Sequence, residues 1–154
     1  MPSPNFESLS DICHQSEGQF LWDVPDGWQQ GQGAFGGLVL AAMVRAAEQA
    51  VDEDLELRTL SAVLCGPAMV GPAVIDVTRL RVGSSTTTAT ISLSQTGQVR
   101  AHATAFFGRP RIDGGDWTDM TPPVVPPWSE VPVLRAAPPQ FPVFAQHIEF
   151  RPLS

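Results

Sequence analysis

The chain has 154 residues and a formal net charge of −7, and its length indicates one domain with a core of its own. The acidic balance argues against nucleic acid as a partner, and the nine basic residues are all arginines, which excludes Schiff-base chemistry and a P-loop lysine. The N-terminus lacks the features of a secretory signal, and no apolar run approaches the ~20 residues of a membrane span. We therefore expect a cytoplasmic protein that does not enter the membrane, with Cys13 and Cys65 as free thiols.

The first expected elements are a short strand and a long, unusually apolar helix. The segment FLWDV (20–24) predicts the strand, and the turn signal Pro25-Asp26-Gly27 ends it. From Phe35 to Ala50 the apolar side chains recur at three- and four-residue spacing, as on the buried face of a helix. Apolar residues fill much of the rest of the first three turns, so we expect the chain to wrap round this helix.

Four longer strands are predicted after the helix, over residues 57–65, 72–82, 84–95 and 99–108. Apolar and polar residues alternate along them, and the connections are too short for crossover helices, so the sheet should be antiparallel. A single buried helix beside such a sheet predicts an α+β fold in which the curved sheet surrounds the helix. One face of the last strand should carry Val99, Ala101, Ala103, Ala105 and Phe107.

The segment GQGAFG (31–36) matches the dinucleotide-binding pattern G-x-G-x-x-G, but its surroundings do not fit that function. No strand leads directly into the glycines, and no second parallel strand with a crossover helix follows, so a dinucleotide-binding fold is rejected. Two interpretations stay open together. Gly33, Gly36 and Gly37 can allow close packing, and the free N–H groups at the helix start can hold a developing oxyanion.

The stretch GQGAFGGLVLAAMVRAA, with LRTLSAVLCGPAMVGP and VTRLRVGSSTTTATISLSQTGQVRAHATAFFG, resembles the N-terminal half of the acyl-CoA thioesterase II family. Members of that family consist of two tandem hot-dog folds. The resemblance covers about residues 15–110 and implies hydrolysis of fatty acyl-CoA thioesters without a metal or other cofactor. It also implies a site where two hot-dog units meet, formed in a homo-oligomer or with a C-terminal half that is missing here.

The resemblance also divides the chain. We expect an N-terminal segment over residues 1–17, a hot-dog domain over 18–108 and a connector over 109–140, where prolines are frequent. Residues 141–154 are expected to form a strand that either begins a second hot-dog unit or adds an edge strand to this domain.

By the same resemblance, the helix start carries the chemistry. Gly36 and Gly37 would donate backbone N–H groups to the thioester oxygen. Substrate would contact Gly33, Ala34 and Phe35, and the acyl chain would lie along Leu38, Leu40 and Met43. Related single hot-dog thioesterases carry an acid two helical turns after the glycines, where this sequence has Val44, so the acid is expected on the second unit.

Two further pairs of residues are candidates outside the helix. Thr59 and Ser61 lie on the polar face of a strand, where the family can place polar groups near the interface between units. Arg79 and Arg81 share one face of the next predicted strand and could bind the coenzyme A phosphates, although ordinary edge charges would look the same. The alternative function is a non-catalytic hot-dog module that binds acyl-CoA or pairs with another unit, because the expected acid is missing from this half.

Overall fold

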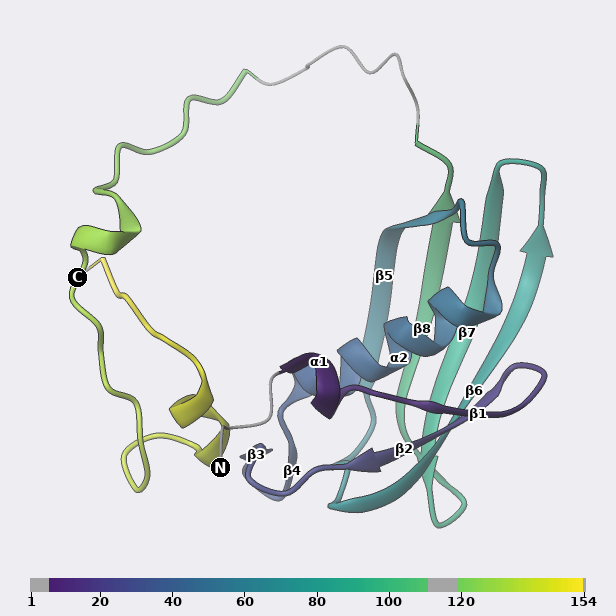
Figure 1. The fold of residues 1–154 in the computed structure, drawn as a ribbon, viewed down its shortest axis with the longest axis horizontal. Helices are drawn as coiled ribbons and strands as arrows, with labels where there is room; N and C mark the ends of the chain where they lie inside the picture. Colours follow the sequence, from purple (N-terminus) through teal and green to yellow (C-terminus); the bar gives the residue numbers. More distant parts are fainter. Residues whose placement is uncertain (1–5, 111–118, 154) are drawn as a thin grey trace.

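The computed structural model describes residues 6–110 and 119–153, and within them a curved sheet lies against one long helix (Figure 1). The sheet has the strand order β1-β2-β6-β7-β8-β5, and every neighbouring pair is antiparallel. The predicted antiparallel sheet around a central helix is therefore confirmed. The strands of this sheet are β1 (Cys13–Ser16), β2 (Gln19–Val24), β5 (Glu56–Leu64), β6 (Gly71–Val82), β7 (Thr86–Gln95) and β8 (Gln98–Gly108). The remaining elements are α1 (Phe6–Leu9), β3 (Gln29–Gln30), β4 (Gly33–Ala34), α2 (Gly36–Ala50) and the 3-10 helices η1 (Trp128–Glu130) and η2 (Val143–His147).

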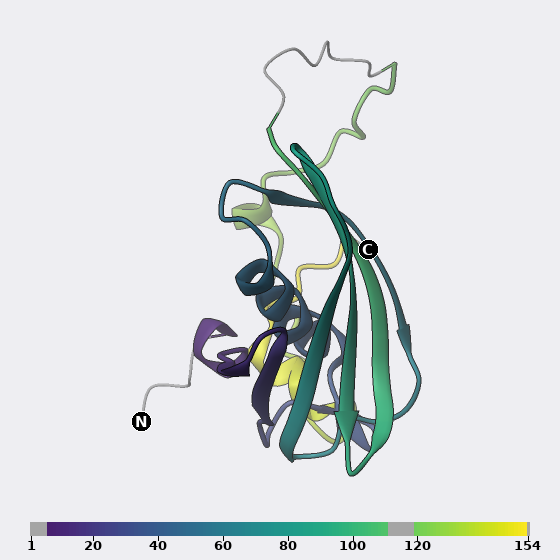
Figure 2. The ribbon, with the colours of Figure 1, turned by 90° about the vertical axis from the view of Figure 1, so that its right-hand side faces the viewer.

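The core lies between α2 and the concave face of the sheet, as the side view in Figure 2 shows. Strand β7 alternates strictly, with every second side chain buried and the serines and threonines between them half-buried on the convex face. Helix α2 directs one face into this concavity and contacts strands β2, β5, β6 and β7. Its six buried residues are Leu38, Val39, Ala42, Met43, Ala46 and Ala47.

The N-terminal residues join the same body. Strand β1 pairs with β2, and the Trp22 indole donates a hydrogen bond of 2.9 Å to the carbonyl oxygen of Leu9. The Phe6 ring meets the Trp28 ring edge-on, with 5.8 Å between the centroids. A domain that begins at residue 18 remains a prediction, and the structure adds β1 to the sheet ahead of it.

The register shifts at four places, once in β1 between His14 and Ser16 and three times within the strands that the sequence predicts. The register shifts by one residue in β5, β6 and β8, and the extra residues are Arg58, Leu80 and Arg100. Ser94 of the convex face pairs with Val99, so Val99 points outward and is exposed rather than lying with Ala101. The prediction for Val99 is wrong because one extra residue reverses the faces of every side chain beyond it.

The C-terminal segment contains little regular structure and docks beside the start of α2. Where the sequence predicted a strand over 141–154, the described residues up to 153 contain η2 and a single bridge between Leu134 and Phe150. The Phe144 ring stacks on Phe35 with 4.2 Å between centroids, and Ala145 is buried. The segment does not form the predicted strand because no neighbouring strand among the described residues pairs along it. Apolar contact with an aromatic surface stabilises it instead.

The described residues were also compared with the requirements of a membrane span, a metal site and a disulfide. No helix among residues 6–110 and 119–153 is long and apolar enough to cross a bilayer. The same residues contain no group of three or more His, Cys, Asp or Glu side chains placed to hold a metal ion. Cys13 and Cys65 are free and exposed thiols, as predicted.

Candidate functional site

Helix α2 begins with two backbone N–H groups that donate no hydrogen bond to the described residues. Phe35 is the N-cap residue in an extended conformation, and no side chain caps the helix. Its carbonyl oxygen accepts hydrogen bonds from the N–H groups of Leu38 and Val39. Among the described residues, nothing accepts from Gly36 or Gly37. These two N–H groups form the positive end of the helix dipole and can bind an oxygen atom that carries negative charge.

The glycines near this helix start are required by close packing. A Cβ atom on Gly33 would lie 2.8 Å from Pro67 Cα, and one on Gly36 would lie 2.8 Å from Leu64 Cδ1. A Cβ atom on Gly37 would lie 2.5 Å from the ring of Phe35. The close-packing interpretation of the motif is therefore confirmed, and the oxyanion interpretation remains a prediction that the free N–H groups support.

A cavity of about 290 Å³ opens at the same end of α2. Its walls come from the helix start, from the end of β5, and from the loop that joins β5 to β6. The lining residues are Gln30, Gln32, Gly33, Ala34, Gly36, Val39, Leu64, Gly66, Pro67, Ala68 and Arg100. The lining contains no carboxylate, and its one formal charge is the guanidinium of Arg100.

Hydrogen bonds from three directions hold the loop that forms one wall of this cavity. The buried side chain of Gln95 accepts from the N–H of Met69 at 2.8 Å and donates to the carbonyl oxygen of Met69 at 2.7 Å. Ala34 donates its N–H to Ala68 at 2.8 Å. The N–H groups of Cys65 and Gly66 both donate to the carbonyl oxygen of Arg100, at 2.8 and 3.1 Å. The wall is therefore fixed by backbone bonds and by one satisfied buried amide.

A family model described as the acyl-CoA thioesterase N-terminal domain matches residues 24–108, which is more than half of the chain. This chain belongs to that family. No protein with a curated description matches it.

Three solved structures show the hot-dog fold for this acyl-CoA thioesterase N-terminal domain. A conserved protein of unknown function with a hot dog fold from Alicyclobacillus acidocaldarius is 31% identical with a TM-score of 0.84, covering 95% of this chain and 54% of that one. A putative thioesterase II from Thermobifida fusca is 22% identical with a TM-score of 0.78, and the match covers 87% of this chain and 50% of that one. The acyl-CoA thioesterase II TesB2 from Mycobacterium marinum is 23% identical with a TM-score of 0.71, and the match covers 83% of this chain and 47% of that one. The chain spans about half the length of each of these structures.

Within this domain, the residues predicted to line the acyl chain have different surroundings. Leu38 and Met43 face the sheet and are fully buried in the core, so neither borders the cavity. Leu40 is half-buried and packs against the edge of the core. Val44 is also half-buried, but it lies outside the contacts of the core cluster. The helix is therefore only partly covered at Val44, where the resemblance led us to look for an acid.

The other predicted site residues are not brought to the helix start. Ser61 pairs with Thr104 on the convex face, and Thr59 pairs with Phe106 there, so the sheet separates both from the glycines. The bulge at Leu80 places Arg79 opposite the buried Ala89 and Arg81 opposite Thr88.

The two arginines therefore do not share one face, because the extra residue reverses the alternation between them. Arg79 pairs with Glu17 at 3.0 Å and lines a different cavity with Gln49 and Ala50, beside the last turn of α2. Arg79 therefore lies at the opposite end of α2 from Gly36, and a coenzyme A phosphate site at this pair stays a prediction.

Arg100 lines the cavity although the sequence pattern does not mark it as a site residue. Regular alternation places it on the polar face of β8 with His102, where a basic residue carries no special signal. The bulge makes it the extra residue, and its side chain turns into the cavity wall. Only the hydrogen-bond register reveals this change, because nothing in the local composition marks the insertion.

Proposed function

We propose that this chain is one half of an acyl-CoA thioesterase, which hydrolyses acyl-CoA thioesters when it is paired with a second hot-dog unit. The free N–H groups of Gly36 and Gly37 are the observation that carries the proposal. Attack of water on the thioester carbonyl places negative charge on its oxygen, and two fixed donors at a helix N-terminus stabilise that charge. The family of the domain supports the same reaction class.

Pairing with a second unit is supported by two uncovered apolar surfaces. Strand β5 is an edge of the sheet, and its side chains Val63 and Leu64 are 63% and 54% exposed. The face of α2 that carries Val44 is also incompletely covered. A second unit joined along β5 would satisfy the open edge and bury these side chains. It would also supply the carboxylate that activates water, which neither Val44 nor the cavity lining provides.

A non-catalytic role in acyl-CoA binding or hot-dog pairing is the second candidate. The absence of a carboxylate from the cavity lining favours it for this chain by itself. Thiol release from a panel of acyl-CoA esters, measured together with acyl-CoA binding, separates the candidates. Turnover supports the enzyme, binding without turnover supports the module, and the absence of both contradicts the two proposals together.

A pair of variants at Gly36 isolates the N–H donor. Gly36→Pro and Gly36→Ala both place a Cβ near the movable end of Leu64, but only proline removes the N–H group. Proline is tolerated at the first helical position, and Phe35 already has the extended conformation that precedes proline. We expect kcat of Gly36→Pro to be about 100-fold below that of Gly36→Ala, as for the loss of one oxyanion donor. Equal activities would contradict the role of this N–H group.

A further inference from the structure

Arg100 is held at the cavity by its backbone and has no partner for its charge. Its carbonyl oxygen accepts two hydrogen bonds from the β5–β6 loop, so the bulged residue is fixed in place. In the described part of the chain, its guanidinium forms no salt bridge and donates no hydrogen bond. The Nε atom is shielded from solvent and has no acceptor among the described residues. Leaving this N–H group of a charged guanidinium without an acceptor is costly, because burial removes its hydration.

The space around the guanidinium fits a ligand group better than a protein partner. Gly66 leaves room beside it, since a Cβ atom there would lie 3.5 Å from Arg100 Nη1. The other side chains that line the cavity are apolar or uncharged, so none of them neutralises the arginine. Bulges next to binding sites commonly redirect a side chain, and here the bulge has turned the only charged group toward the cavity.

We propose that Arg100 makes this cavity a carboxylate-binding site, and that the acyl group accepted beside Gly36 is a short chain that ends in a second carboxylate. The planar guanidinium matches a carboxylate with two parallel hydrogen bonds from its Nη groups. The cavity volume of about 290 Å³ lies at the small end of ligand sites, which limits the acyl group to a short chain. The carboxylate site rests on Arg100 alone, and the dicarboxylic acyl substrate rests in addition on the proposed function.

A single carboxylate is favoured over a phosphate group by charge. Arg100 is one guanidinium without a second cation in the cavity lining, and the chain has a net charge of −7. A phosphate monoester carries between one and two negative charges and is normally bound by several donors or cations. One arginine among uncharged neighbours balances one carboxylate.

The first experiment measures binding with the chain itself. Sodium pentanoate is titrated into the labelled protein, and the amide signals of Gly36 and Gly66 are followed by NMR, with pentanamide as the neutral analogue of the same shape. We expect pentanoate to shift both signals, pentanamide to bind at least about tenfold more weakly, and Arg100→Gln to weaken pentanoate binding by a similar factor. Arg100→Lys keeps the positive charge but not the paired donors of the guanidinium. Its affinity for pentanoate should therefore lie between that of the unchanged chain and that of Arg100→Gln.

Arg135→Gln is the matched control, because Arg135 is an exposed arginine with no ion pair among the described residues. It should bind pentanoate like the unchanged chain. Thermal unfolding of Arg100→Gln establishes that the variant is folded, so that lost binding reflects the lost guanidinium. The proposal is overturned if pentanamide binds the unchanged chain as tightly as pentanoate does, if Arg100→Gln binds pentanoate as tightly as the unchanged chain, or if inorganic phosphate binds more tightly than pentanoate.

The second experiment tests the substrate class in the assembly that shows thiol release. The ratio of kcat/KM for glutaryl-CoA to that for pentanoyl-CoA is compared between the unchanged protein and Arg100→Gln. We expect this ratio to fall roughly tenfold or more in the variant, because only the glutaryl group carries a carboxylate for Arg100. An unchanged ratio overturns the dicarboxylic substrate. An assembly that binds pentanoate through Arg100 but cleaves no thioester contradicts the proposed function and leaves the carboxylate site established.

Discussion

The two ends of helix α2 each border a cavity and an arginine beside a β-bulge, yet they differ in chemistry. At the N-terminal end the cavity of about 290 Å³ combines two free N–H groups with the unpaired Arg100. At the C-terminal end a larger cavity of about 500 Å³ is lined by His14, Glu17 and Arg79, and the arginine is already paired with the glutamate. Cavity size does not distinguish a site from a surface hollow. Unused hydrogen-bond donors on a fixed backbone do, because they have binding energy left for a ligand.

The two ends also differ in how firmly they are built. Backbone contacts at glycine, the buried Gln95 amide and the Phe35–Phe144 stack fix the N-terminal end. At the C-terminal end, the Val77 N–H donates to the carbonyl oxygen of Gly18 at 2.7 Å, but Arg79 is held by an exposed ion pair between side chains. We therefore expect substitution of the packed groups at the first end to reduce stability more than substitution of Arg79 at the second.

The largest loss of stability is expected for Gly33→Ala. Its Cβ atom would lie 2.8 Å from Pro67 Cα and 2.9 Å from the backbone nitrogen of Ala68, and backbone atoms cannot move aside as a side chain can. We expect the free energy of unfolding to fall by about 3 kcal/mol, measured by urea denaturation. Gly66→Ala is the control, because its nearest new contact is at 3.5 Å and should be tolerated. Equal losses for the two variants would show that the packing at Gly33 is not special.

The next largest effect is expected for Gln95→Met, which keeps the length of the side chain and removes its amide. The N–H and carbonyl groups of Met69 would lose their partners at 2.8 and 2.7 Å. We expect the free energy of unfolding to fall by about 2 kcal/mol and amide hydrogen exchange to become faster in the loop from Cys65 to Val70. Gln98→Met, at an exposed position of the same hairpin, should change neither quantity. Unaltered exchange in the Gln95 variant would contradict the view that this amide holds the cavity wall.

The sequence predicted most of the fold because its signals are repeated over many residues. The apolar spacing from Phe35 to Ala50 and the alternation along β7 each involve several residues that agree. A bulge is one extra residue, and it leaves composition and alternation nearly unchanged while it redirects Arg100 and Val99.

The candidate site was predictable in part for the same reason. The glycines at the start of α2 form a local pattern that is visible in the sequence. Arg100 could not be recognised, because its importance depends on its register with Ser94 and on a loop far away in the chain. Docking of Phe144 on Phe35 was equally invisible, since nothing in a single sequence links two distant aromatic residues.

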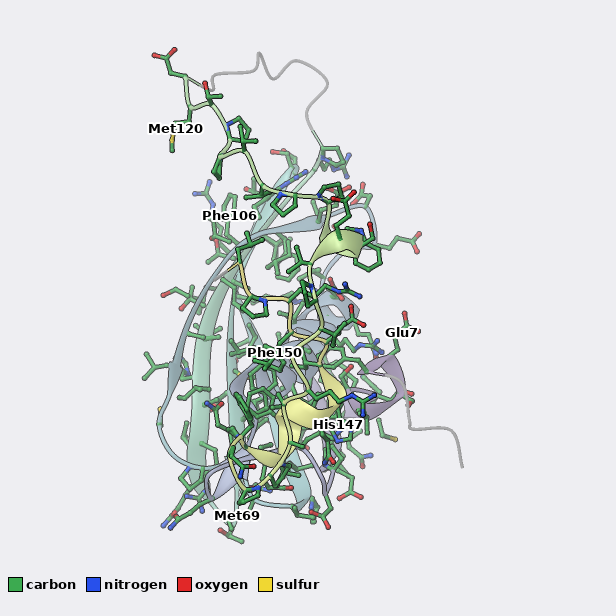
Figure 3. The ribbon with its side chains drawn as sticks, turned by 90° about the vertical axis from the view of Figure 1, so that its left-hand side faces the viewer. Glu7, Met69, Phe106, Met120, His147 and Phe150 are labelled. Carbon is green, nitrogen blue, oxygen red and sulfur yellow. The ribbon has the colours of Figure 1, made fainter. Side chains whose placement is uncertain are left out.

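A smaller and local effect is expected for Phe144→Ala. The ring lies parallel to Phe35 at 4.2 Å, and Phe35 in turn lies against Gly37, so the C-terminal segment supports the helix start from outside. Figure 3 labels His147, the last residue of the same short helix. We expect the free energy of unfolding to fall by about 1 kcal/mol and protease sensitivity to increase around residues 141–150. Phe141→Ala removes an exposed ring that has no stacking partner among the described residues and serves as the control. Equal sensitivity in both variants would show that the stack does not secure the segment.

The smallest effect is expected for Arg79→Gln at the opposite end of α2. The Arg79–Glu17 pair is at 3.0 Å, but the glutamate side chain is 90% exposed, and exposed pairs contribute little because water and salt screen them. We expect the free energy of unfolding to change by at most about 0.5 kcal/mol, and this change should disappear at high salt. The KM for acyl-CoA should stay the same. A rise in KM with intact stability would instead show that Arg79 contacts the coenzyme A phosphates, as the sequence suggested. It would also show that the two ends of the helix, each with its own cavity, serve one ligand.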